Sequence, residues 1–223
     1  EDCTPNVLEL RDLLLAKSQY TLVKLSPMLD WRKEVADFDG TVREVHIVAT
    51  GNECKELLLV LGQQVHEEPS APRVFCVNDN QRIDYDSAAY TQGLRIGGKP
   101  LPEAKNYLYE PNASIMKAGC FDLVEERFGV TQVGPSSHLF VSATPVADFP
   151  GRGFAIESIG GMNKKDIKRL LNGTKQANIA VRNFPLTAPQ LRKKLKLADG
   201  GPVYLFGTTM QGCDHVLLRT SKI

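Results

Sequence analysis

Long hydrophobic runs are missing from this 223-residue chain. The longest apolar stretch, Leu57–Leu61, is far shorter than the roughly 20 residues that a membrane-spanning helix needs. The sequence does not open with a basic segment, an apolar core and a cleavage site, so nothing indicates secretion. We therefore expect a cytoplasmic protein with no membrane partner.

Paired cysteines are missing too. The five cysteines are odd in number and widely scattered, and none belongs to a Cys-x-x-Cys pair: Cys3, Cys54, Cys76, Cys120 and Cys213. Disulfide frameworks and zinc sites need paired or regularly spaced cysteines. We therefore expect reduced thiols and no metal site.

The common catalytic signatures are also absent. The sequence contains no G-x-S-x-G, no H-E-x-x-H, no Walker loop and no G-x-G-x-x-G after a strand. The four histidines are isolated from one another, and His46 and His215 fall within predicted strands, which favours a structural role for these two. The sequence therefore names no catalytic residue.

A strong charge asymmetry is present instead. Residues 151–223 contain 13 basic and 4 acidic residues, whereas residues 1–150 contain 14 basic and 22 acidic ones. The net charge of +1 thus hides a segment of +9 and a segment of −8. Such asymmetry is typical of a polyanion-binding module joined to another domain.

Helical and strand patterns alternate over the first third of the chain, which indicates a parallel or mixed sheet with helices on its faces. The predicted elements are helices over 6–17 and 30–37 and strands over 20–25, 42–49 and 73–77. Residues 53–61 fit a helix capped by Asn52, with a buried strand as the alternative.

The pattern is lost from 79 to 110, where turn-forming residues dominate. A helix over 111–127 and a strand over 138–142 follow, and residues 145–153 form the clearest linker. Beyond this linker the predicted order is βαβαββ, which is typical of a split-βαβ, ferredoxin-like sandwich.

The two helices of this βαβαββ module carry the excess positive charge. Their leucines would pack while the basic side chains face solvent. The basic residues are Lys164, Lys165, Lys168, Arg169, Arg192, Lys193, Lys194 and Lys196. Both helices lie on one side of such a sheet, so the two clusters would form one surface. It predicts salt-sensitive binding of phosphates, with a merely solvated helix face as the open alternative.

Three stretches carry a family resemblance: Val23–Asp30, Glu44–Leu58 and Tyr107–Gly119, with Tyr-Leu-Tyr-Glu-Pro at 107–111 the most specific. They resemble the bacterial class I S-adenosylmethionine-dependent methyltransferases that carry a THUMP-like domain. The resemblance covers nearly the whole chain.

The resemblance implies an α/β and α+β fold class, in which a partial Rossmann-like methyltransferase sheet precedes a ferredoxin-like βαβαββ module. The implied domains are the truncated end of the methyltransferase domain (1–78), a small ferredoxin-like insert (79–149) and a basic THUMP-like module (150–223). It places Asp2, Ser26 and Asp30 at the rim of the cofactor cleft. For Ser26 and Asp30, strand punctuation and helix capping are the favoured alternative explanation. The cofactor loop and the catalytic residues would lie before Glu1.

The sequence thus predicts the C-terminal fragment of an RNA methyltransferase, with RNA and the missing N-terminal part of the same protein as its partners. S-adenosylmethionine is the expected cofactor of the complete protein. We expect no cofactor bound to this fragment, and no activity from it alone. The alternative is a non-catalytic interaction module that binds protein or RNA without methyl transfer.

Overall fold

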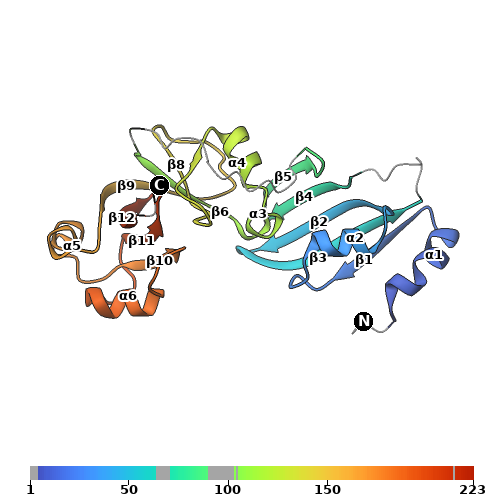
Figure 1. Ribbon diagram of the computed structural model, residues 1–223, viewed down its shortest axis with the longest axis horizontal. Coiled ribbons are helices and arrows are strands. Elements are labelled where there is room, and N and C mark those ends of the chain that lie inside the picture. The colour runs from blue at the N-terminus through green and yellow to red at the C-terminus, as the bar shows by residue number, and fades with distance from the viewer. Residues whose placement is uncertain (1–4, 64–70, 90–102, 104, 213) are drawn as a thin grey trace. The chain divides into compact units, whose positions relative to one another are not determined.

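The computed structural model describes residues 5–63, 71–89, 103, 105–212 and 214–223, which form two compact units (Figure 1). The first unit comprises residues 1–93 and 112–120, and the second comprises 94–111 and 121–223. None of the described helices is long and apolar enough to cross a membrane.

The first unit is built on a five-stranded mixed sheet of order β1-β3-β2-β4-β5. Its strands are β1 (Tyr20–Leu25), β2 (Val42–Thr50), β3 (Glu53–Gly62), β4 (Arg73–Asn78) and β5 (Gln81–Asp86). Its helices are α1 (Val7–Lys17), α2 (Trp31–Asp37) and α3 (Ala113–Ala118). β3 runs antiparallel to both β1 and β2, and β4 runs parallel to β2. The mixed sheet expected from the alternating pattern is therefore present.

The predicted helix over 53–61 is wrong, because this stretch is strand β3. Its buried leucines recur at every second position, which is the period of a strand. They are Leu57, Leu59 and Leu61. Gly51 (φ 58) and Asn52 (φ 63) both have left-handed backbones, as a two-residue type I′ hairpin requires. Asn52 therefore closes a hairpin and does not cap the helix that was predicted over 53–61.

Two further expectations differ from the structure. Strand β5 and strand β6 (Tyr107–Pro111) lie within 79–110, where no pattern was predicted. The single helix expected over 111–127 is two helices, α3 and α4 (Phe121–Phe128), and Gly119 ends the first with φ 68. Pro111 ends β6, and Asn112 caps α3 by accepting the Ile115 N–H.

The second unit is built on a seven-stranded sheet of order β10-β11-β12-β9-β6-β8-β7. Its remaining elements are β7 (Thr131–Gln132), β8 (Phe140–Ser142), β9 (Gly151–Gly160), α5 (Lys164–Leu171), β10 (Asn178–Arg182), α6 (Ala188–Leu195), β11 (Val203–Thr209) and β12 (His215–Lys222). The order from β9 to β12 is the predicted βαβαββ. The predicted linker at 145–153 leads directly into β9, which pairs with β6.

The two faces of this sheet bury different cores. On one face, Leu170 of α5 and Leu191 of α6 pack with Leu205 and Leu217. Both helices therefore cover the same face, as expected. The opposite face buries an aromatic-rich cluster: Leu108, Val133, Leu139, Val141, Phe154, Phe206 and Leu218.

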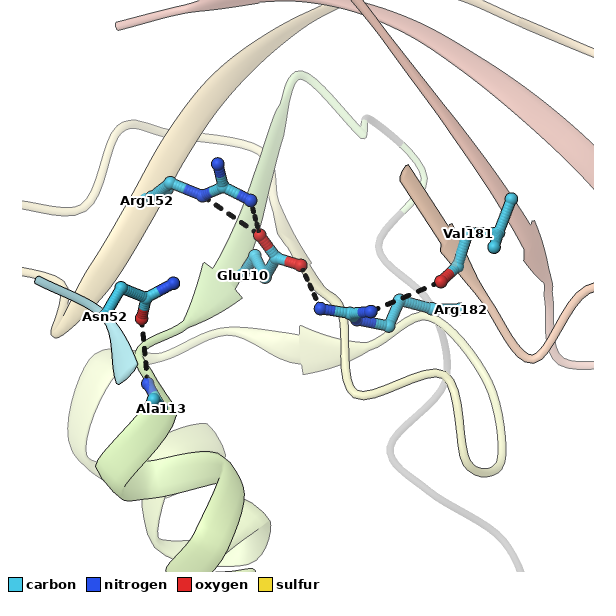
Figure 2. Close-up of polar contacts among 6 residues, drawn as sticks. All are labelled: Asn52, Glu110, Ala113, Arg152, Val181 and Arg182. Carbon is cyan, nitrogen blue, oxygen red and sulfur yellow. Dashed lines mark hydrogen bonds and ion pairs between the residues drawn. The ribbon is translucent and has the colours of Figure 1, made fainter. Parts of the chain in front are cut away.

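One buried carboxylate joins distant strands of the second sheet (Figure 2). Glu110 on β6 is 3% exposed and pairs with Arg152 on β9 and, at 2.7 Å, with Arg182 on β10. In the sheet order β6 and β10 are four strand spacings apart, which is roughly 19 Å in a flat sheet. The contact therefore requires the sheet to curl toward the face opposite α5 and α6, here called the concave face. The register between β12 and β9 shifts between Arg219 and Thr220, where Glu157 of β9 has no paired residue. Such an irregularity of the bulge type helps strands to bend.

We predict that Glu110→Gln destabilises the second unit. The glutamine keeps the shape but leaves two guanidinium groups without their carboxylate. Breaking a buried pair costs about 3–5 kcal/mol, and the half exposure of both arginines lowers this to about 2 kcal/mol. Thermal denaturation should show a midpoint lower by about 4–8 °C. The control is Glu157→Gln, which removes the half-exposed partner of Arg219. Equal losses for the two variants would contradict this role of Glu110.

His138 is a half-buried polar residue of this unit. Its ring stacks on Phe121 with centroids 4.4 Å apart, and its Nδ1 atom is buried without a hydrogen-bond partner among the described residues. Burial, and secondarily the charge of Arg182, lower the pKa of His138 below its ordinary value of 6.5. The folded chain therefore favours the neutral ring.

The unfolding free energy should accordingly depend on pH through His138. Because the pKa of His138 is lower in the folded chain, the unfolding free energy is highest above about pH 6.5. It decreases as the pH falls below that value, by at most about 1.4 kcal/mol per pH unit. Urea unfolding at several pH values measures this slope. His138→Asn is the matched control, since asparagine tolerates the left-handed backbone of this position (φ 52). An unchanged slope in that variant would refute the assignment.

Candidate functional site

Seven of the eight predicted nucleic-acid-binding residues are exposed, and six of these seven are lysines. They are Lys164, Lys165, Lys168, Lys193, Lys194 and Lys196, here called the lysine face. Among the described residues, no ion pair involves any of them; the pairs of this region use arginines. Because α5 and α6 pack on the same core, the lysine face lies on one side of the sheet.

The two predicted arginines form ion pairs and hydrogen bonds with neighbouring residues of the second unit. Arg169 pairs with Asp166 at 3.1 Å and donates to the Ile159 carbonyl at 2.8 Å. Arg192 donates to the carbonyls of Ala177 and Ala198, both at 2.9 Å, and pairs with Asp199. Both guanidinium groups therefore stabilise the loops around the helices. They are less available than the lysines to bind phosphates.

Local capping fixes both helices of the lysine face. Asn163 accepts the Asp166 N–H at the start of α5, and Thr187 forms a capping box with Gln190 at the start of α6. The hydrogen bond from the Gly161 N–H to Asp166 lowers the pKa of that carboxyl group. These caps stabilise the first turns of α5 and α6, the two helices that position the lysines.

The predicted rim of the cofactor cleft is only partly described. Asp2 lies outside the described residues. Ser26 and Asp30 share the turn between β1 and α2, where Asp30 accepts the Arg32 N–H at 3.0 Å and Ser26 accepts the Met28 N–H at 3.3 Å. Both side chains are exposed. They serve local turns in this structure, and a role at a cofactor site stays a prediction.

A polar network that was not predicted lies where the parallel strands β2 and β4 end. The Gly51 N–H donates to Asp79, and the Asn52 N–H donates to the side chain of Asn78, each at 3.1 Å. Figure 2 shows the Asn52 side chain accepting the Ala113 N–H at 2.9 Å, which holds the start of α3. Ligands bind outside the carboxyl ends of strands in open α/β sheets. The shared direction of β2 and β4 was the signal that could have located this network.

A cavity of about 810 Å³ lies at the opposite strand ends of the first unit. Its walls include Tyr20, Glu44, Arg43 and Arg73, at or near the first residues of β1, β2 and β4. The volume suits a small molecule, but Arg73 is already paired with Asp84. Cofactors of open α/β sheets bind at the carboxyl ends of the parallel strands, whereas this cavity lies at their amino ends. Its position therefore does not favour a cofactor cleft.

The first unit also contains a buried group of titratable side chains. Cys76 and Cys120 are hydrogen-bonded to each other beside Tyr85, and all three are buried. The bond from Cys76 lowers the pKa of Cys120, whereas desolvation raises the pKa of Tyr85. Burial keeps these thiols from substrates, which favours a structural role. In the described part of the chain, no three metal-ligating side chains lie close enough together to hold a metal ion.

Comparisons with known proteins agree with this organisation. Residues 107–150 match the family model of a ferredoxin-like domain, and residues 151–222 match that of a THUMP domain-like module. No curated protein sequence matches the chain.

A solved structure is similar over almost all of the chain. It is the crystal structure of a protein from Porphyromonas gingivalis W83 that is described as a putative methyltransferase. The two are 33% identical with a TM-score of 0.88, and the similarity covers 99% of this chain and 55% of that one. This chain therefore carries a ferredoxin-like and a THUMP-like domain. It spans about half the length of the similar protein.

Proposed function

We propose that this chain is the substrate-binding, C-terminal portion of an S-adenosylmethionine-dependent methyltransferase that acts on RNA. The methyl donor would bind to the complete protein, with the catalytic residues in the part that precedes Glu1. The proposal rests on the resemblance of the sequence, on the solved structure that is similar to it, and on the two features of the chain described next.

The open edge of the first sheet carries the proposal. Among the described residues, β1 pairs only with β3, and its Tyr20 and Leu22 side chains are 61% and 63% exposed. β1 and β2 are parallel to each other, with β3 inserted antiparallel between them. Sheets with parallel strands are usually covered on both faces. An edge strand with exposed apolar side chains therefore fits a sheet that continues into further strands and helices of a catalytic domain.

The lysine face supports RNA as the substrate. The six lysines of the lysine face have no ion pair within the part of the chain that the structure describes, and they lie on or directly after the two capped helices α5 and α6. Such lysines attract phosphates, and phosphate binding releases counterions. A THUMP-like module joined to a methyltransferase would thus present RNA to the catalytic domain.

The fragment should bind structured RNA weakly, with an affinity that falls as salt rises. If about four phosphates are contacted, the affinity should fall by roughly two orders of magnitude between about 50 and about 300 mM salt. Fluorescence anisotropy measures this. Reversal of Lys164, Lys168, Lys193 and Lys194 to Glu should abolish binding with an unchanged circular dichroism spectrum.

The matched control reverses four lysines of the first unit, Lys17, Lys24, Lys33 and Lys55. It changes the net charge by the same amount, and the surface ion pairs it breaks contribute little to stability. Salt-independent binding, or equal losses in the two variants, would rule out the lysine face as the RNA site.

Methyl-donor binding tests the other half of the proposal. Calorimetric titration of S-adenosylmethionine into residues 1–223 should give no binding heat, because the cofactor loop is expected elsewhere. The chain extended by its upstream residues should bind both S-adenosylmethionine and S-adenosylhomocysteine. Binding heat from the fragment alone would contradict this placement of the cofactor site, and no heat from the extended chain would contradict methyl transfer.

A further inference from the structure

A small cavity opens on the concave face of the second sheet, on the side away from α5 and α6. Its volume is about 210 Å³, and it is lined by Arg152, Asn178, Ile179, Ala180, Tyr204 and Phe206. Ala180, Tyr204 and Phe206 belong to or border the core of that face. The cavity is smaller than the roughly 300 Å³ at which pockets for drug-sized ligands begin. It therefore suits a fragment such as one base.

Positive charge is held in excess beside this cavity. Arg152 and Arg182 share the single carboxylate of Glu110, so the three groups carry one net positive charge. The carboxylate is 3% exposed, whereas the arginine side chains are 44% and 39% exposed. Solvent and ligands therefore reach the cations but not the anion. Arg152 donates to Glu110 through Nε and Nη2, and Arg182 donates to it through Nη2. The remaining N–H groups of the two cations, with the net positive charge, favour a phosphate.

An aromatic surface and an amide complete the cavity. Tyr204 is half-buried, and its ring lies 5.1 Å from that of Phe154, tilted by 53°. Asn178 on the neighbouring strand donates from Nδ2 to the Gly201 carbonyl at 2.7 Å, which fixes its amide. Proteins that bind single-stranded RNA stack bases on aromatic rings and read their edges with polar groups.

We propose that this cavity holds one nucleotide of single-stranded RNA, with its base against Tyr204 and a phosphate on Arg152 and Arg182. The proposal rests on the RNA-binding part of the proposed function and gives it a second surface. β10 is the edge strand of the sheet, and α6 packs over its other face. One RNA strand can therefore pass around β10 and contact both the lysine face and the cavity.

Adenosine monophosphate is the simplest probe of the cavity. In a nuclear magnetic resonance titration it should shift the amide signals of Asn178, Ala180 and Tyr204 in a saturable way. Adenosine and inorganic phosphate, each carrying half of the ligand, should bind at least about tenfold more weakly than the nucleotide, as expected when stacking and ion pairing both contribute. Shifts confined to α5 and α6 would overturn the proposal.

Variants separate stacking from folding. Tyr204→Leu should weaken nucleotide binding about tenfold, while Tyr204→Phe keeps the ring and should bind like the unchanged protein. Arg152→Lys keeps the charge beside Glu110 but loses the planar fork, and should weaken binding of the nucleotide and of phosphate alike. Leu22→Ala, at an exposed position of β1, is the control and should have no effect.

RNA affinity distinguishes a failure of this inference from a failure of the proposed function. RNA binding that depends on the lysine face but is equal in Tyr204→Leu and the unchanged protein would refute the cavity and leave the proposed function standing. Loss of RNA binding in the unchanged protein, even at low salt, would refute both. A loss shared by Tyr204→Leu and the lysine reversals confirms two contact surfaces.

Discussion

The ion pairs of Glu110 are the interaction on which the second unit depends. Glu110 is buried on β6 and pairs with Arg152 of the neighbouring strand. It also pairs with Arg182, which is 72 residues from Glu110 in the sequence. Gly151 starts β9 directly against the Glu110 carbonyl, where any side chain would collide. The carboxylate cannot be buried alone, because the cost of desolvating it requires both cations. The curled sheet brings those cations to it.

A continuous sheet joins strands of the two family domains. The ferredoxin-like segment ends at residue 150 and the THUMP-like segment starts at 151, yet β6 of the first pairs with β9 of the second. The aromatic core of the concave face is shared between them. The sheet beneath the lysine face therefore continues into the strands of the ferredoxin-like segment.

Much of the fold was accessible from local patterns. The βαβαββ order from β9 to β12 followed from alternating periods, because each helix has one leucine stripe. Strand β3 was predicted first as a helix, with a buried strand as the alternative, since Leu57–Leu61 is continuously apolar and Asn52 resembles a helix cap. Its identity depends on the positive φ angles of Gly51 and Asn52, which allow the hairpin with β2. Strand β5 was missed because its polar side chains give no strong alternation.

By itself the sequence determined where the positive charge is concentrated and which helices carry it, because lysines on amphipathic helices face water in any compact fold. It did not determine which basic residues are free. Tertiary structure assigned Arg169 and Arg192 to loop contacts and left the six lysines of the lysine face without an ion pair to any described residue. Tertiary structure also brought Glu110, Arg152 and Arg182 together beside Tyr204. Such contacts depend on the curl of a sheet whose strands are distant in the sequence, and no local pattern encodes that curl.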